Sequence, residues 1–447
     1  MKRAIRTNSH TGDDYLGSSP EASGGTKKHI IEYMKKLTFL SILLSLTTVI
    51  SLADTPNGTD DYLDIGGAVR FNVISQNYEN PKTAESTSAT LDTWRLNVAA
   101  RYSGIVLDFE YRFYPTFNTH FIHHGYIGYN FTDELNIQLG VTQVPFGNLT
   151  YNSHSWWFLI PYYLGLEDDY NMGIKLSYDI NSRLNLMTAY FRQSEPAGPS
   201  YGQASFGGPG AGTYSYNVIP DEDGALSENG SPANLRELNQ YNLRLGYMLF
   251  EGTEIGISGQ IQGLYNSVLQ DIEYGHAFAA HINSDFNNFN VKVQYTNYNY
   301  KARDDEGNLL KRVQMGAYGD PYYGDGVAAK ADILTAGISY SHDVEWGPIS
   351  NIQPYFNYSV MNKNGSLNVN GTQHRFENSL MMVPGFLITA GNIFTYVDWA
   401  FGKNQPWLTD YFGTGLGAGH LDENGIPVPA NELSWNKRFN INIGYYF

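Results

Sequence analysis

The sequence of 447 residues contains no cysteine, so thiolate metal ligands and a disulfide framework are both excluded. It has only one long apolar run, at residues 37–52, whereas helical membrane proteins need repeated runs of about 20 apolar residues. Basic residues are scarce, at 28 against 44 acidic ones, which argues against nucleic acid as a partner. There is no G-x-S-x-G signature and no phosphate-binding glycine loop. We therefore predict no enzyme, no cofactor and no metal site.

Aromatic residues are abundant in a chain that is polar on average. They make up 15% of the sequence, with 35 tyrosines, while the mean hydropathy is −0.35. A transmembrane β-barrel has this composition, because only every second residue of each strand contacts lipid.

The single apolar run has the features of a secretory signal. It follows Met34, Lys35 and Lys36, and it ends in Ser51-Leu52-Ala53, a small-residue cleavage site. We therefore expect residues 1–33 to be a spurious N-terminal extension, residues 34–53 to be a signal peptide, and residues 54–447 to form the mature domain. A single membrane anchor is the alternative, but the run is short and contains Ser and Thr.

Extended segments with strict alternation recur along the whole chain. In the last segment, the apolar residues from Phe439 to Phe447 fall on one face, and Asn and Arg residues fall on the other. Successive side chains of a strand point to opposite faces, so each segment has one apolar and one polar side. About sixteen segments occur, most near the roughly 9–11 residues of a tilted transmembrane strand: 62–74, 93–102, 105–113, 120–131, 135–144, 171–180, 184–192, 238–249, 254–262, 276–284, 289–300, 332–340, 352–360, 379–389, 392–402 and 435–447.

Short and long connections alternate between these segments. The short ones are 103–104, 132–134, 181–183, 250–253, 285–288 and 390–391; the long ones are 75–92, 145–170, 193–237, 301–331, 361–378 and 403–435. Outer-membrane barrels have an even number of strands, brief periplasmic turns and long external loops. The sequence therefore predicts an all-β fold, a transmembrane antiparallel β-barrel of about sixteen strands.

The segment at 135–144 continues into a motif of the form G-x-x-x-x-P-F-G, with Gly140, Pro145, Phe146 and Gly147 at its fixed positions. With the long loop that follows and the terminal Phe447, this stretch resembles the phosphate-selective porin O and P family. The likeness covers most of 54–447 in layout and only these residues in detail. It implies a water-filled barrel, a homotrimer in the outer membrane of a Gram-negative bacterium, that passes small anions such as phosphate. It also implies that Phe447 is the C-terminal insertion signal for the outer-membrane assembly machinery.

The loop at 145–170 is the third external loop if both termini face the periplasm. In porins of this plan that loop folds inward and narrows the channel, so we expect it to be the constriction loop. Its aromatic and acidic residues are then expected at the constriction: Trp156, Trp157, Tyr162, Tyr163, Glu167, Asp168 and Asp169. An ordinary surface loop or a trimer contact is the alternative.

Charged residues on the polar faces are expected to point into the lumen, where rings of charge set selectivity. The predicted pore-lining bases are Arg70, Arg95, Arg101, Arg112, Lys175, Arg244, Lys292 and Arg438. The acids Asp64, Asp108, Glu110, Glu254 and Asp398 share these faces. Alternatively, Arg101 and Arg112 simply pair with Asp108 and Glu110 as salt bridges.

Three histidines, His120, His123 and His124, form a possible metal-binding cluster. On a regular strand His120 and His124 share one face and His123 points to the other, so we interpret them as histidines at the barrel rim.

Together these features predict passive diffusion of small hydrophilic solutes, with anions such as phosphate favoured by the resemblance. A general or cation-selective pore is the first alternative. An outer-membrane enzyme of lipase type and a structural barrel plugged by its own loops are two others.

Overall fold

The computed structural model describes residues 61–77, 87–149, 151–197, 212–318, 325–405 and 415–447. They belong to one compact unit, Asp60–Phe447. The expected N-terminal extension and signal peptide lie outside the described residues.

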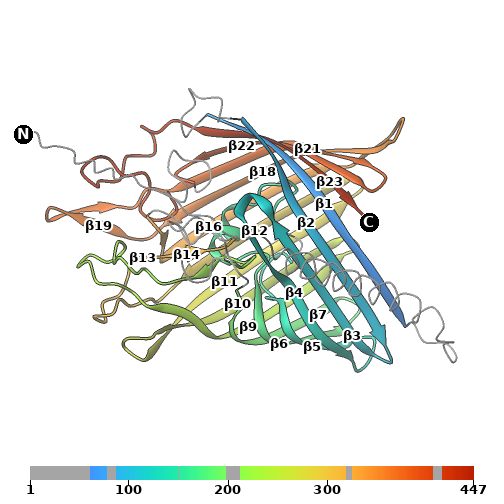
Figure 1. Cartoon of the computed structure of the whole chain (residues 1–447), viewed down its shortest axis with the longest axis horizontal. Helices are drawn as coiled ribbons and strands as arrows, with labels where there is room; N and C mark the ends of the chain where they lie inside the picture. The colour runs from blue at the N-terminus through green and yellow to red at the C-terminus, as the bar shows by residue number, and fades with distance from the viewer. Residues whose placement is uncertain (1–60, 78–86, 150, 198–211, 319–324, 406–414) are drawn as a thin grey trace, which may run out of the picture. The chain divides into compact units, whose positions relative to one another are not determined.

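Sixteen strands form the wall of this unit within the described residues (Figure 1). They are β1 (Tyr62–Gln76), β2 (Thr87–Tyr102), β3 (Ile105–Tyr114), β4 (Thr119–Asn130), β5 (Leu135–Gln143), β6 (Tyr170–Asn181), β7 (Leu184–Ser194), β9 (Leu235–Phe250), β10 (Thr253–Asn266), β11 (Asp271–Phe286), β12 (Phe289–Asn299), β16 (Lys330–Tyr340), β18 (Ile349–Lys363), β21 (Ser379–Ala390), β22 (Ile393–Lys403) and β23 (Asn436–Tyr446).

The wall is a closed antiparallel cylinder. Each wall strand pairs with the next along the chain, and β23 returns to pair with β1 from Ala68↔Tyr446 to Gln76↔Arg438. Closure gives every strand two neighbours, so no edge of backbone N–H and C=O groups faces the lipid. The predicted fold, an antiparallel barrel of about sixteen strands, is confirmed.

The remaining elements are short. A hairpin of β19 (Ser366–Val369) and β20 (Thr372–Arg375) projects from one connection, and β17 (His342–Trp346) pairs with β18. Four two-residue strands lie in connections: β8 (Asn217–Val218), β13 (Arg312–Val313), β14 (Met315–Gly316) and β15 (Val327–Ala328). Two 3₁₀ helices complete the described secondary structure, η2 (Pro115–Phe117) and η3 (Ile160–Leu164). No helix among the described residues is long and apolar enough to cross a membrane.

The connections alternate in length as predicted, and both termini of the barrel lie at the end with the short turns. There, Gly67 N–H donates to the Phe447 carbonyl at 2.8 Å. At the other end, eight connections, L1 to L8, join the strand pairs. Three of them matter for the site: L3 (144–169, between β5 and β6), L4 (195–234, between β7 and β9) and L6 (300–329, between β12 and β16). The L5 connection is only residues 267–270, because β10 and β11 extend beyond the predicted segments 254–262 and 276–284.

The outer surface of the wall is apolar. Leu139, Ile127 and Leu243 are each about half or more exposed, whereas the alternate positions of the same strands are mostly polar or small. Large aromatic side chains, exposed on the same surface, cluster where the strands meet the short turns: Tyr102, Phe131, Phe250, Phe286 and Phe447. Such an apolar band bordered by an aromatic belt matches a hydrocarbon layer with its headgroup interface.

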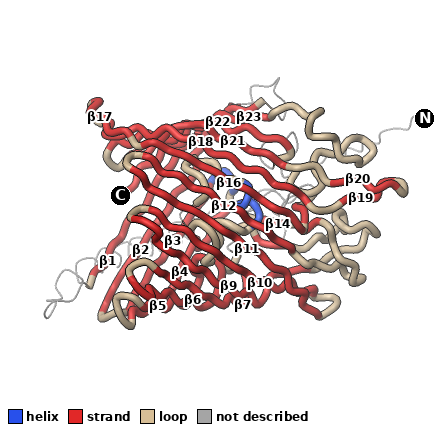
Figure 2. Tube along the Cα trace, turned by 180° about the vertical axis from the view of Figure 1, so that it is seen from behind, coloured by secondary structure: helices blue, strands red, loops and turns tan. Residues whose placement is uncertain are grey.

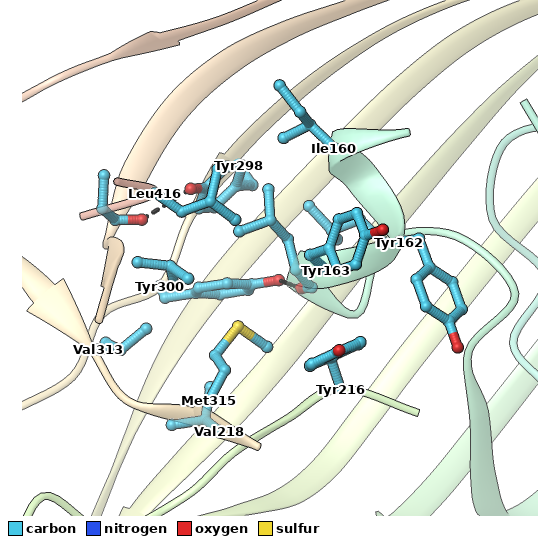
Figure 3. Packing of buried hydrophobic residues seen from close by; sticks show 14 of the residues in the cluster. Ile160, Tyr162, Tyr163, Tyr216, Val218, Tyr298, Tyr300, Val313, Met315 and Leu416 are labelled. Carbon is cyan, nitrogen blue, oxygen red and sulfur yellow. Dashed lines mark hydrogen bonds between the residues drawn. The ribbon is translucent and has the colours of Figure 1, made fainter. Parts of the chain in front are cut away.

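The interior is partly filled by a dry cluster of loop residues. Aromatic and aliphatic side chains of L3, L4 and L6 pack against one another and against inward-facing residues of the wall. Figure 3 shows Tyr300 of L6 beside η3, where its hydroxyl donates to the Leu164 carbonyl at 2.5 Å. Figure 2 shows η3 within the outline of the strands, and its five residues are buried. Loop side chains thus fill part of the interior, where the resemblance implied a water-filled barrel.

Candidate functional site

The Pro-Phe-Gly motif turns the chain from the wall into the lumen. Gly147 has a φ of 61°, and its N–H donates to Ser258 Oγ of β10 at 3.0 Å. The guanidinium of Arg244 on β9 donates to the Gly147 carbonyl at 2.8 Å. A Cβ at this position would lie 2.2 Å from Gln294 Oε1 of β12, so any other residue would displace that side chain and strain the backbone. Phe146 is buried in the loop cluster. The motif therefore anchors L3 to the wall strands across the lumen.

L3 then crosses the barrel and binds the far wall at several points. The N–H of Asn148 donates to Gln294 Oε1 at 2.8 Å, and the N–H of His154 donates to Asn357 of β18 at 3.0 Å. The N–H of Trp156 donates to Asp398 of β22 at 3.0 Å. These bonds pair backbone donors of the loop with polar side chains that alternation directs inward. L3 thus lies inside the barrel.

The L3 aromatic residues occupy two environments. Trp156 lies against the Arg70 guanidinium of β1 at 4.3 Å from ring centroid to Cζ, and Trp157 lies against Arg438 of β23 at 4.7 Å. Cation–π contacts of this kind hold a charge beside an apolar surface. Tyr162 and Tyr163 instead belong to the dry cluster, where the Tyr162 hydroxyl bonds that of Tyr318 in L6.

The three L3 acids lie at the base of the loop and are buried. Glu167 accepts hydrogen bonds from the Asn152 N–H at 3.0 Å and from its amide at 2.7 Å, and burial raises the pKa of Glu167 to about 7. Asp168 accepts from Tyr214 Oη at 2.5 Å, and burial raises its pKa. Burial also raises the pKa of Asp169 well above its usual value. These carboxylates accept bonds that hold the loop together, and none of them borders the cavity described next.

A cavity of about 580 Å³ remains between L3 and the wall formed by β1, β2, β3, β22 and β23. Five of the predicted pore-lining bases border it: Arg70, Arg95, Arg112, Lys292 and Arg438. Asp92 is its one acidic lining residue among the described part of the chain. Aromatic rings of L3, L4 and L6 form much of the opposite side, including Trp156, Trp157, Tyr162, Tyr163, Tyr214 and Tyr318.

Carboxylates neutralise some of these bases. The Nε of Arg70 lies 3.1 Å from Asp92 Oδ2. Glu110 pairs with Arg112, as one of the alternatives predicted, and lies 3.6 Å from Arg95. Two carboxylates are thus shared among three arginines, so the cavity wall keeps an excess of positive charge.

The other three predicted bases lie away from the cavity. Arg101 stacks over Tyr62 near the turn end, at 5.9 Å. The Lys175 ammonium donates to the Gln143 carbonyl at 3.0 Å, and Arg244 pairs with Glu254 beside the Gly147 anchor.

The histidine prediction was wrong about the faces. A register shift in the β3–β4 pairing places His124 opposite Glu110 and Ile122 opposite Tyr111, so His123 is the extra residue of a β-bulge. As a result His123 and His124 both lie on the inner side, with their Nδ1 atoms 2.8 Å apart, and His124 Nε2 lies 3.1 Å from Asp108. No group of three or more His, Cys, Asp or Glu residues in the described ranges could hold a metal ion.

Several residues of the cavity were not predicted. Asp92 lies in β2, although the alternation assigned it to the preceding loop, and Tyr214 and Tyr318 lie in long loops with no periodicity. The only signal for the loop residues is the density of tyrosines in segments that otherwise look like solvent-exposed connections.

Comparison with known proteins supports the fold. No family model matches the chain, and no curated protein matches its sequence. Among solved structures, the outer membrane channel DcaP of Acinetobacter baumannii is similar, with a TM-score of 0.51 and 12% identity over 89% of this chain and 100% of that one. OmpT of Vibrio cholerae, an outer-membrane expressed protein, gives a TM-score of 0.49 and 12% identity over 88% and 100% of the two chains.

The fold and its surface define the class of protein. A closed barrel with an apolar exterior is the form in which β-strands span a membrane, and sixteen antiparallel strands with short turns at one end are typical of bacterial outer membranes. The chain is an outer-membrane β-barrel.

Proposed function

We propose that this barrel is a porin, a diffusion channel for small hydrophilic solutes that passes anions more readily than cations. The observation that carries the proposal is the position of L3: its tryptophans lie against the arginines of β1 and β23, and both border a cavity inside the barrel. Fixed charges at a narrow, partly desolvated point bias which ions enter. No covalent step is involved, so the protein is not an enzyme in this proposal.

The predicted anion preference rests on the charge of the cavity wall. Five bases and one acidic residue, Asp92, border the cavity, and Asp92 and Glu110 form salt bridges with three of those bases. Phosphate is the anion that the family resemblance implies, and the general preference for anions is what the side chains support.

Stepwise conductance in planar bilayers tests the proposal. We expect the refolded protein to insert and produce discrete current steps in potassium chloride. Absence of steps from protein that is folded, as judged by its heat-modifiable mobility in detergent gels, contradicts it.

One observation favours a second candidate, a structural barrel closed by its own loops. The cluster formed by L3, L4 and L6 is dry and occupies part of the lumen. The same recording separates the two functions, because a plugged barrel gives no current.

We also propose that the protein is a homotrimer, that residues 34–53 are removed on export, and that Phe447 directs insertion by the outer-membrane assembly machinery. Chemical crosslinking, N-terminal sequencing of the membrane form and deletion of Phe447 test these three proposals separately.

A further inference from the structure

The cavity beneath L3 is unusually rich in aromatic rings for a passage that would serve only small inorganic ions. Thirteen of the residues that border it are Trp, Tyr or Phe. A small, strongly hydrated ion such as phosphate gains nothing from these surfaces, whereas binding sites for organic molecules are mostly apolar and aromatic with a few polar groups. The volume of about 580 Å³ is also typical of such a site.

Four guanidinium groups are stacked on rings that border the same cavity. Besides the Arg70–Trp156 and Arg438–Trp157 pairs, Arg112 lies 4.6 Å from the Tyr214 ring and Arg95 lies 4.9 Å from the Tyr446 ring: four pairs in one wall. A guanidinium that lies over a ring face still directs its N–H groups outward in its own plane, where a carboxylate can accept two of them at once. Aromatic surface and carboxylate-binding groups are therefore presented together.

The acceptor Asn72 Oδ1 and three donors of this lining make neither a hydrogen bond nor an ion pair with the described residues, and the three donors bear on the ligand. They are Arg95 Nε, the indole Nε1 of Trp157 and Ser153 Oγ, and all three atoms are buried. The Ser153 residue is itself 4% exposed. A buried donor without an acceptor is costly, so such atoms indicate a bound group that supplies acceptors. Two of the three atoms can only donate, so the bound group must present acceptor atoms, as a carboxylate does.

We propose that this cavity is a binding site for planar organic anions, specifically aromatic carboxylates of about the size of benzoate. The carboxylate accepts from the guanidinium and indole N–H groups of the wall, and the ring packs against the tryptophans and tyrosines. This inference deepens the proposed channel function by naming the class of solute. The passage of aromatic carboxylates through the barrel rests on the proposed function, whereas their binding in the cavity does not.

Equilibrium binding to the detergent-solubilised barrel tests the inference without requiring conductance. Isothermal titration calorimetry compares benzoate with cyclohexanecarboxylate, glucuronate and inorganic phosphate. Benzoate is expected to bind at least about fivefold more tightly than cyclohexanecarboxylate, which has the same charge and a similar size but no π face. Equal affinities for these two, or tighter binding of glucuronate or phosphate, overturn the inference.

Two variants locate the site. Trp156→Leu is expected to weaken benzoate binding about tenfold, since it removes one stacking surface. Trp399→Leu, on the exposed outer face of β22, is the matched control and leaves the affinity unchanged. An unchanged affinity in folded Trp156→Leu protein places any benzoate site elsewhere and overturns the assignment; if that variant does not fold, the ligand series on the unmodified protein still decides.

The outcomes also distinguish this inference from the proposed function. Benzoate binding without current steps contradicts the channel and leaves the binding site standing. Current steps with anion preference, but with benzoate no better bound than phosphate, contradict the binding site alone.

Discussion

Replacement of Gly147 by alanine tests how L3 is held inside the barrel. The residue has a φ of 61°, a conformation that costs an L-residue with a side chain roughly 1–2 kcal/mol. The new Cβ would also lie 2.2 Å from Gln294 Oε1, so that side chain must move and its bond to the Asn148 N–H is lost, at about 0.5–1.5 kcal/mol. Together, these two effects should destabilise the docked loop by roughly 1.5–3.5 kcal/mol.

Hydrogen–deuterium exchange of L3 peptides, read by mass spectrometry, measures this loss. Because each 1.4 kcal/mol is a factor of ten, exchange through local opening should accelerate roughly 10- to 300-fold in Gly147→Ala. Gly391→Ala is the control: this glycine, in the β21–β22 turn, has a φ of 59° and no neighbouring atom within 4 Å of an added Cβ. In Gly391→Ala, the L3 peptides should exchange at the same rate as in the unmodified protein. Unchanged L3 exchange in Gly147→Ala would refute the anchoring role of the motif.

Three further predictions concern pH, lipid and charge. Burial raises the pKa of Glu195 in L4 from 4.5 to about 8, so ionisation of this carboxyl favours the undocked form of L4. Packing of L4 inside the barrel should therefore weaken, and proteolysis of L4 should accelerate, as the pH rises from about 5 to 9. Glu195→Gln should make the rate of L4 proteolysis less dependent on pH. Leu139→Arg, on the lipid face, should lower the free energy of unfolding in vesicles by about 2–4 kcal/mol in a urea titration, and Gln138→Arg, on the opposite face, by much less. Arg438→Gln removes a positive charge from the cavity wall, so the reversal potential under a potassium chloride gradient should move toward zero. Arg375→Gln, in the exposed β19–β20 hairpin, should leave this potential unchanged.

Each of these predictions has a contrary result. Proteolysis of L4 that is equally slow or slower at pH 9 than at pH 5 contradicts the role given to the buried Glu195 carboxyl. Equal losses at positions 138 and 139 contradict the division of the wall into a lipid face and a water face. An unchanged reversal potential in Arg438→Gln removes this arginine from the selectivity of the channel.

The wall of the barrel was predictable because a single physical requirement repeats along it. Each strand separates lipid from the interior, so residues such as Leu139 and Gln138 alternate regardless of the rest of the fold. The turn ends were equally clear, because two-residue connections such as Ser103-Gly104 allow few conformations.

The interior was less predictable because its contacts join residues that are far apart in sequence. The Trp156–Asp398 bond spans 242 positions, and no local pattern indicates that pairing. Alternation also fails at a bulge, as at His123, where one extra residue redirects the side chains around it. The L3 acids were expected at the constriction, but side chains such as Glu167 accept bonds from the loop itself and do not border the cavity.

The reversal potential under a potassium chloride gradient is the most direct test of the central claim, that L3 and the basic wall form an anion-preferring aqueous passage. The excess of bases around the cavity predicts a reversal potential closer to the equilibrium potential of chloride than to that of potassium. A potential on the potassium side would contradict the claim, and so would folded protein that carries no current.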